Sequence, residues 1–175
     1  MAQHKFATQF ALEGRTALVT GASSGLGRHF ASVLARAGAR VIVGARRTDR
    51  LDALVGEIAA EGGVAHAVAM DVTDGENIAA AFDDGEAALG PVSILVNNAG
   101  IPSSSYFLKI DPAEWRSVLD VNLDGVFRVG QEAAKRMAAR GEGGAIVNIS
   151  SVLGLGVLKT LAPYAVSKAG VIQLT

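Results

Sequence analysis

The hydrophobic positions along this chain follow two alternating spacings. Short apolar runs are followed by segments in which apolar residues recur three or four positions apart, as on one face of an amphipathic helix. The helical spacing is clear in Phe30, Val33, Leu34 and Ala37 and again in Leu51, Leu54, Val55 and Ile58. The apolar runs predict buried strands at residues 17–19, 41–43, 64–70, 94–96 and 145–149.

Strands without a polar face, alternating with amphipathic helices, are typical of a parallel sheet that helices cover on both sides. Right-handed crossovers then give a doubly wound, three-layer α/β/α architecture whose ligand crevice lies beyond the carboxyl ends of the strands. The 175 residues suit a single domain of this class, with residues 1–13 as an N-terminal extension.

A long helix is predicted from Asp111 to about Arg140. Asp111 can cap its amino end, Pro112 fits the first helical position, and Glu114 can reach back as the partner in a capping box. A final helix is predicted over residues 164–175.

Composition narrows the classes of function. Half of the residues are hydrophobic and 19% are charged, as in a folded globular protein, and the net charge of -1 gives no general attraction for nucleic acid or anionic membranes. Cysteine is absent and the three histidines are scattered, so no metal site is expected. No apolar run suits a secretory signal or a membrane span, and we expect a soluble cytoplasmic protein.

A glycine-rich turn joins the first strand to the first helix. Such a turn lets the backbone approach a pyrophosphate, and the helix N-terminus offers free N–H groups to the phosphates, as in a Rossmann-type dinucleotide-binding domain. An ordinary strand-to-helix turn is the alternative reading, because glycine makes up 21 of the 175 residues. The predicted cofactor-binding positions of this turn are Gly21, Ser23, Ser24, Gly25, Leu26 and Gly27.

The end of the second strand bears on the choice of cofactor. Arg46 and Arg47 follow this strand where a carboxylate would favour the ribose 2′-hydroxyl of NAD. An arginine can bind a 2′-phosphate through charge-assisted hydrogen bonds, so Arg46 favours NADP. If both arginines are instead solvated loop charges, NAD stays possible.

Six motifs, in order, give the sequence a resemblance to the short-chain dehydrogenase/reductase family from about residue 14 to residue 175. Within the family, the sequence resembles the 3-oxoacyl-acyl-carrier-protein reductase and glucose-dehydrogenase-like members. The motifs are Thr20-Gly21-x-x-x-Gly25-x-Gly27, Asp71-Val72-Thr73, Asn97-Asn98-Ala99-Gly100, Asn122, Ser150-Ser151 and Tyr164-x-x-x-Lys168.

The resemblance implies further cofactor contacts. Asp71 and Val72 would hold the adenine, and Asn98, Ala99 and Gly100 would line the cofactor beside the fourth strand. Taken without the family, Asp71 is equally suited to a turn or cap, and the asparagine–glycine segment to a turn that ends a strand.

The resemblance also implies a catalytic group. Tyr164 and Lys168 lie four residues apart, so both side chains emerge on one helical face. Tyr164 would exchange a proton with an alcohol or carbonyl, Lys168 would assist it and bind the cofactor, and Ser151 would hold the substrate oxygen. The main chain at Asn122 would hold a water in a proton relay, although a local helix kink is the alternative for this residue.

The expected reaction is hydride transfer between NADP(H), or NAD(H), and a small carbonyl or alcohol compound. A non-catalytic dinucleotide-binding module that senses redox state or scaffolds a partner is the alternative. Residues 103–108 and 152–161 are expected to face the substrate.

Two expectations concern the whole protein. Family members usually continue with further strands, which this chain lacks, so we expect it to be part of a longer polypeptide. The long helix is more apolar than one buried face requires, which favours a homo-oligomer, a tetramer or a dimer. The apolar residues concerned are Trp115, Val118, Leu119, Leu123, Val126 and Phe127.

Overall fold

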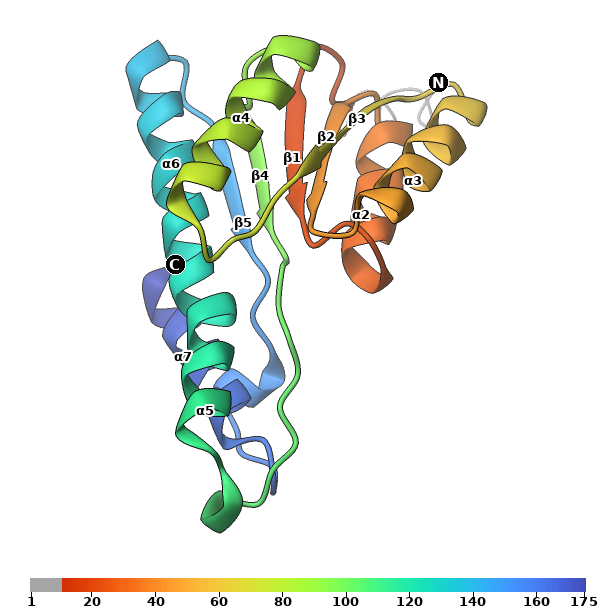
Figure 1. Cartoon of the computed structure of the whole chain (residues 1–175). Coiled ribbons are helices and arrows are strands. Elements are labelled where there is room, and N and C mark those ends of the chain that lie inside the picture. The colour runs from red at the N-terminus through yellow and green to blue at the C-terminus, as the bar shows by residue number, and fades with distance from the viewer. Residues whose placement is uncertain (1–10) are drawn as a thin grey trace, which may run out of the picture.

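The predicted strands form one parallel sheet in the order β3-β2-β1-β4-β5 (Figure 1). The computed structural model describes residues 11–175, so most of the predicted N-terminal extension lies outside the described residues. The strands are β1 (Thr16–Thr20), β2 (Arg40–Ala45), β3 (Val64–Ala69), β4 (Ile94–Asn97) and β5 (Ala145–Asn148). The helices are α2 (Gly25–Arg36), α3 (Thr48–Ala60), α4 (Gly75–Leu89), α5 (Pro112–Leu119), α6 (Gly125–Arg140) and α7 (Ala162–Leu174).

The strand order reverses beside β1. The chain builds outward from β1 to β2 and β3, and then returns to place β4 on the other side of β1. Ligands of doubly wound sheets bind beyond the carboxyl ends of the strands at such a switch point. The predicted fold class is confirmed.

Two hydrophobic clusters cover the two faces of the sheet. Neighbouring residues of β1 point to opposite faces, so Val19 packs in one cluster and Leu18 in the other. The Val19 cluster includes residues of α2 and α3, and the Leu18 cluster includes residues of α4 and α6. These are the three predicted layers.

The predicted apolar face of α2 is wrong in part. Small residues form its buried face, namely Gly27, Ala31 and Ala35, whereas the predicted Val33 is exposed. Phe30 and Leu34 are only partly buried against the cluster. The reason is steric, because α2 packs close against the strands and leaves little room for larger side chains.

The predicted long helix is divided by a turn of π-helix over Asp120–Asp124, between α5 and α6. Asp111 caps α5 as expected, since its carboxylate accepts a hydrogen bond of 2.7 Å from the N–H of Ala113. The predicted capping role of Glu114 is wrong. Its carboxylate instead accepts hydrogen bonds from the hydroxyls of Ser103 and Ser105, at 3.0 and 2.8 Å.

Local residues set the start of two further helices, and α7 begins two residues earlier than predicted. Asp74 accepts hydrogen bonds from the N–H groups of Glu76 and Asn77, which starts α4 at Gly75. α7 begins at Ala162, with Pro163 in its first turn, where its missing N–H costs nothing.

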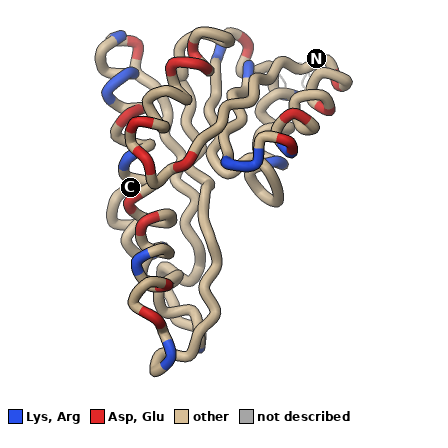
Figure 2. The backbone as a smooth tube through the Cα atoms, viewed as in Figure 1, with Lys and Arg blue, Asp and Glu red and all other residues tan. Residues whose placement is uncertain are grey.

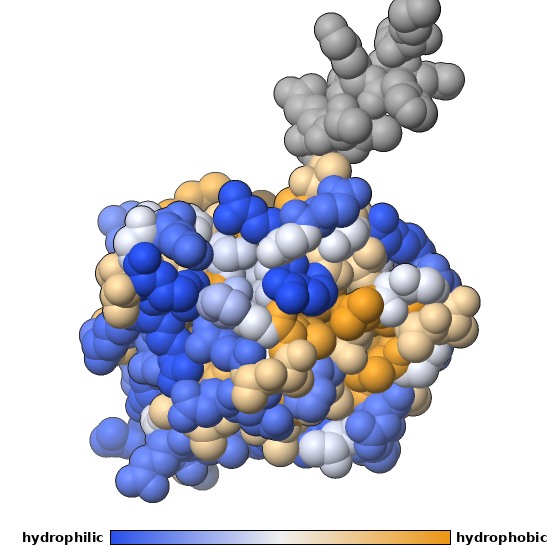
Figure 3. Space-filling view, turned by 90° about the horizontal axis from the view of Figure 1, so that it is seen from above, coloured by the Kyte–Doolittle hydropathy of each residue, from blue (hydrophilic) through white to orange (hydrophobic). Residues whose placement is uncertain are grey.

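The molecule extends well beyond the carboxyl edge of the sheet (Figure 1). This extension consists of α5, part of α7 and the loops at residues 98–110 and 149–161, and its loops carry few charges (Figure 2). The opposite end is mostly hydrophilic, with a smaller group of hydrophobic residues (Figure 3). Within residues 11–175, the helices are too short or too polar to cross a membrane.

Candidate active site at the switch point of the sheet

The turns that follow β1 and β4 are bound to each other. The hydroxyl of Thr20 accepts hydrogen bonds of 3.0 Å from the N–H groups of both Asn98 and Ala99. The side-chain amide of Asn98 donates back to the carbonyl of Thr20, also at 3.0 Å. The two turns that flank the switch point therefore form one rigid unit.

Two glycines of the first turn allow this close packing. Gly21 has a φ of 67°, and a Cβ there would lie 2.8 Å from the Cα of Ala99. A Cβ at Gly27 would collide with the Asn98 side chain and the carbonyl of Gly21. The backbone approach that the sequence predicts for these glycines is present in the fold.

A crevice of about 590 Å³ lies over these turns and the ends of β2 and β3. Every cofactor residue predicted at the strand ends lines it except Gly25 and Gly27. Ser24, just before α2, makes no side-chain cap to the helix, so no cap occupies the first-turn N–H groups there. The lining residues are Gly21, Ser23, Ser24, Leu26, Ala45, Arg46, Arg47, Met70, Asp71, Val72, Asn98, Ala99, Gly100, Ile101 and Val121.

The two arginines after β2 make different contacts. Arg47 donates to the hydroxyls of Ser23 and Ser24, at 2.9 and 3.1 Å, and so joins the loop after β2 to the glycine turn. A guanidinium nitrogen of Arg46 lies 4.0 Å from a carboxylate oxygen of Asp71. The sequence-based prediction singled out Arg46, but both arginines line the crevice.

Asp71 makes the contacts of a turn residue while lining the crevice. One carboxylate oxygen accepts hydrogen bonds from the N–H and the hydroxyl of Thr73, at 3.0 and 2.7 Å. These hydrogen bonds, with a smaller contribution from Arg46, hold the pKa of Asp71 below its usual value. The carboxylate is therefore fixed and charged at neutral pH.

A second cavity of about 440 Å³ adjoins the crevice and contains Tyr164 and Lys168. Four residues line both spaces, namely Leu26, Asn98, Gly100 and Ile101. The remaining lining residues of the smaller cavity are Pro102, Ser103, Ile149, Ser150, Leu153, Leu161, Tyr164 and Lys168. Parts of both segments expected to face the substrate, 103–108 and 152–161, are among them.

Lys168 is almost completely buried beside Tyr164. Its side chain is 4% exposed, and its Nζ donates a hydrogen bond of 2.6 Å to the carbonyl of Ile149, just after β5. The same nitrogen lies 5.7 Å from the centre of the Tyr164 ring. Burial lowers the pKa of Lys168 below that of a free lysine, because the charged form loses its hydration.

The two serines after β5 use their hydroxyls differently. Ser150 donates a hydrogen bond of 2.8 Å to the carbonyl of Lys168 and lines the smaller cavity. Ser151, predicted as the catalytic serine, precedes a short 3₁₀ turn, and its oxygen accepts from the N–H of Leu153 at 3.2 Å. Ser151 does not line the cavity in this structure, although its neighbour does.

Asn122 is fully buried within the π turn. Its side chain pairs with the main chain of Ile101, accepting from the N–H at 2.8 Å and donating to the carbonyl at 2.9 Å. It also donates to the hydroxyl of Ser167 at 3.3 Å, and that hydroxyl donates to the carbonyl of Tyr164 at 2.7 Å. Asn122 thus links the loop after β4 to the helix that bears Tyr164.

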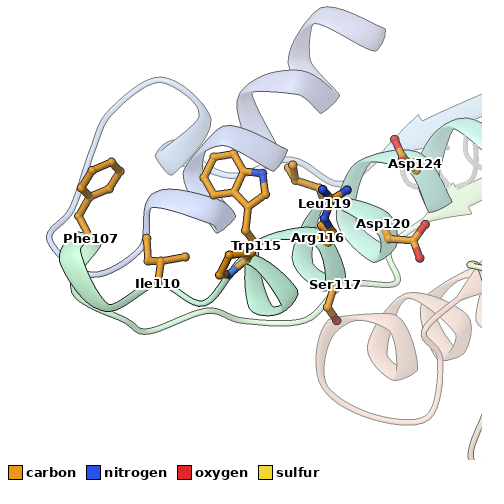
Figure 4. Close-up of a pocket in the computed structure, with 9 residues that line it drawn as sticks. Phe107, Ile110, Trp115, Arg116, Ser117, Leu119, Asp120 and Asp124 are labelled. Atoms are coloured by element: carbon orange, nitrogen blue, oxygen red, sulfur yellow. The ribbon is translucent and has the colours of Figure 1, made fainter.

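A third and larger cavity, of about 830 Å³, contains none of the predicted site residues. It is an open hollow along α5 and the π turn (Figure 4). Its lining residues are Phe107, Ile110, Pro112, Trp115, Arg116, Ser117, Leu119, Asp120 and Asp124. Among residues 11–175 we find no group of three or more potential metal ligands, here or elsewhere.

Comparison with known proteins agrees with this geometry. Residues 15–175 match the short chain dehydrogenase family. The chain belongs to this family. It is 41% identical over 165 residues to the 3-oxoacyl-acyl-carrier-protein reductase FabG of Aquifex aeolicus, a match that covers 94% of this chain and 66% of that protein.

Solved structures show the same relationship. A short-chain type dehydrogenase/reductase from Mycobacterium marinum has a TM-score of 0.91 and 39% identity, covering 95% of this chain and 66% of its own. A variant of actinorhodin polyketide ketoreductase, solved with NADPH, has a TM-score of 0.88 and 39% identity, covering 92% and 62%. The chain therefore spans slightly less than two thirds of the length of these relatives.

Proposed function

We propose that this short chain dehydrogenase is an oxidoreductase that transfers a hydride between NADP(H) and a small carbonyl compound or secondary alcohol, with Tyr164 as general acid and base. The observation that carries this proposal is the pairing of Tyr164 with buried Lys168 in a cavity that shares a wall with the crevice over the glycine turn. Substrate and cofactor could thus meet beside the phenol.

The crevice supports a dinucleotide as the cofactor. The uncapped N-terminus of α2, the close backbone turn and two arginines provide groups suited to phosphates. Arg46 and Arg47 favour NADP, in keeping with the relative solved with NADPH, while NAD stays possible. A nicotinamide cofactor, when bound, supplies or accepts the hydride.

The residues of the chain itself would manage the proton and the substrate oxygen. In the reducing direction, Tyr164 donates its phenolic proton to the carbonyl oxygen as negative charge develops there. The Lys168 ammonium, close to the ring and poorly hydrated, stabilises the phenolate that remains. In the oxidising direction, the Tyr164 phenolate would accept the proton of the alcohol beside the same Lys168 ammonium.

The hydrogen bonds of the two serines support Ser151 over Ser150 as the group that holds the substrate oxygen. The Ser150 proton is already donated to the carbonyl of Lys168, whereas the Ser151 hydroxyl accepts a hydrogen bond from Leu153 and keeps its own proton to donate. To reach a substrate in the cavity, the Ser151 side chain would have to turn away from its contact with Leu153.

Asn122 supports the site in two ways. Its side chain fixes Ile101 against the helix of Tyr164, and the π turn around it disturbs the regular carbonyl–amide pairing of the helix. A main-chain carbonyl there could hold the water of the proposed relay to Lys168. The predicted kink and the predicted relay are therefore compatible.

Substitution of Tyr164 tests the proposed function. Tyr164→Phe should lower kcat by about 100-fold or more, because the proton donor is lost, while cofactor affinity changes little. The matched control is Tyr106→Phe, since Tyr106 is 67% exposed and does not line the cavity that contains Tyr164. The measurement is NADPH and NADH oxidation over a panel of carbonyl compounds.

The outcomes separate the two candidate functions. Equal turnover by the Tyr164→Phe variant and the parent protein would reject the catalytic role. A parent protein that binds cofactor but reduces nothing in the panel would favour the non-catalytic binding module.

We also propose that the protein assembles with copies of itself. Phe127 is exposed on α6, and Trp115 and Leu119 line the open hollow on α5. Apolar side chains left uncovered in this way are typical of surfaces that contact another chain.

A further inference from the structure

The loop that follows β4 forms one wall of the smaller cavity. Ile101, Pro102 and Ser103 line it together with residues of α7 and of the loop after β5. Ser103 is 5% exposed, although it lies in a loop with no regular secondary structure. Contacts from other parts of the protein must hold this segment in place, because loops have few main-chain hydrogen bonds of their own.

Glu114 is the residue that holds it. One carboxylate oxygen accepts the hydroxyl proton of Ser103 at 3.0 Å, and the other accepts that of Ser105 at 2.8 Å. Hydrogen bonds to a carboxylate are stronger than those between neutral groups. The carboxylate is free for this task because Asp111 already caps α5.

Two further contacts make the anchoring complete. Asn122 fixes the main chain of Ile101, at the start of the wall. At its end, the N–H of Ser105 donates a hydrogen bond of 2.9 Å to the carbonyl of Thr160, a residue with a φ of 70°. A non-glycine residue seldom adopts this conformation, so the surrounding contacts must maintain it. Leu161, the next residue, lines the same cavity.

We propose that Glu114 is a positioning residue for the substrate. Acting through Ser103 and Ser105, it fixes the wall of the cavity that faces Tyr164 and so determines how tightly, and in which orientation, a substrate is held there. This inference rests on the proposed function. It assigns Glu114 no contact with the substrate and no share in the proton transfer.

The cofactor should be little affected by a change at this position. Ser103 lines only the smaller cavity, whereas the crevice over the glycine turn is bounded by residues that the Thr20 and Asn98 contacts hold independently. Loss of Glu114 should therefore raise the KM for the substrate and leave cofactor affinity unchanged, which general destabilisation of the protein would not do.

The experiment compares Glu114→Gln, Ser103→Ala and the double variant with the parent protein. Glutamine keeps the size of the side chain but carries no charge and has one acceptor oxygen in place of the two that the serines bind. Both single variants should raise the substrate KM by about tenfold, the change expected from losing one charge-assisted hydrogen bond, with a smaller effect on kcat. The double variant should be no worse than Glu114→Gln alone, because Ser103 acts through Glu114.

Asp124→Asn is the matched control. It removes one negative charge from the same stretch of helix, at an exposed residue for which the structure shows no side-chain hydrogen bond. The control should leave KM at the parent value. The conservative variant Glu114→Asp should recover part of the affinity, because its shorter carboxylate can still accept hydrogen bonds.

Amide hydrogen exchange gives a second readout that needs no turnover. Residues 103–106 should exchange faster in Glu114→Gln than in the parent or in Asp124→Asn, while the strands stay protected. An unchanged KM together with unchanged exchange in this segment would overturn the inference. An inert parent protein would reject the proposed function alone, since exchange would still decide whether Glu114 holds the wall.

Discussion

The side chain of Lys168 combines a charge with near-complete burial. Its ammonium group donates a hydrogen bond to the carbonyl of Ile149, and burial penalises the charged form of the side chain. Such a group lowers the stability of the folded state and persists where function requires it. The lowered pKa of Lys168 has the same cause, because the folded protein disfavours the charged form of the side chain.

Lys168→Met should therefore give a more stable but inactive protein. At neutral pH we expect the free energy of unfolding to rise by about 1 kcal/mol, or the Tm by about 2–4 °C. Because the pKa of Lys168 is lower in the folded protein than the usual 10.5, the unfolded chain binds more protons between these values, and the stability of the parent rises with pH in that window. The advantage of methionine should shrink there.

Thermal unfolding of both proteins from pH 7 to pH 11 measures this difference. A methionine variant that is less stable at neutral pH would show that the bond to Ile149 outweighs the cost of burying the charge. A stability difference independent of pH would exclude the ammonium as its source.

Whole elements were predicted well where burial alone decides them. The strands need only be apolar to pack between two layers of helices, and all five lie where the apolar runs predicted them. The buried face of α2, the role of Glu114 and the π turn could not be predicted in this way. Each depends on a partner distant in sequence: the turn at Asn98, the serines of the loop after β4, and Ile101.

The residues of the candidate site likewise fall into those that the sequence predicts and those that only the structure reveals. The motifs placed Tyr164, Lys168 and the glycine turn at the carboxyl ends of the strands, where the structure has them. Ser167 was missed because a serine in a helix gives no signal until its neighbour Asn122 is known. Arg47 had a signal, since it adjoins Arg46, but the sequence does not show which arginine reaches the glycine turn.

On the proposed function, the loop after β2 and the start of α2 would act together in choosing the cofactor. Arg46→Ala and Arg47→Ala should each weaken NADPH binding by about tenfold or more, because each removes a potential partner of the 2′-phosphate, and should change NADH binding far less. Arg50→Ala, on the exposed side of α3, is the matched control and should affect neither. Fluorescence titration with both nucleotides gives the affinities.

These two substitutions also distinguish the roles of the arginines. Equal losses of affinity for NADPH and NADH would contradict the proposal that the arginines bind the 2′-phosphate. A loss confined to Arg47→Ala would transfer the role from Arg46, which Asp71 would then hold as an ordinary surface ion pair.

At the scale of the whole molecule, the structure reduces the apolar surplus that suggested self-association. Val118 and Val126 are buried in the protein itself, so they are not free for a partner. Trp115, Leu119 and Phe127 keep part of their surface uncovered. Further exposed apolar residues occur on the extension beyond the sheet, namely Tyr106, Phe107, Leu108, Val152, Leu155, Val157 and Leu158.

Phe127→Glu should weaken self-association by about tenfold or more, because it would place a charge in an apolar contact. Val33→Glu is the matched control, since Val33 on α2 is 44% exposed and Phe127 is 47% exposed. Sedimentation velocity over a range of protein concentrations measures the assembly. A parent protein that stays monomeric at micromolar concentration would contradict the proposal, and so would equal effects of the two variants.

The crevice over the glycine turn and the smaller cavity share some lining residues but not others. This division limits how the nucleotide and substrate specificity of the protein can change. Leu26, Asn98, Gly100 and Ile101 line both spaces, so on the proposed function a substitution at any of them would alter nucleotide and substrate recognition together. A change of substrate specificity that leaves the nucleotide preference unaltered therefore needs substitutions at positions that line only the smaller cavity. Pro102, Ser103, Leu153 and Leu161 are such positions, and they lie in loops or in a short 3₁₀ turn outside the sheet.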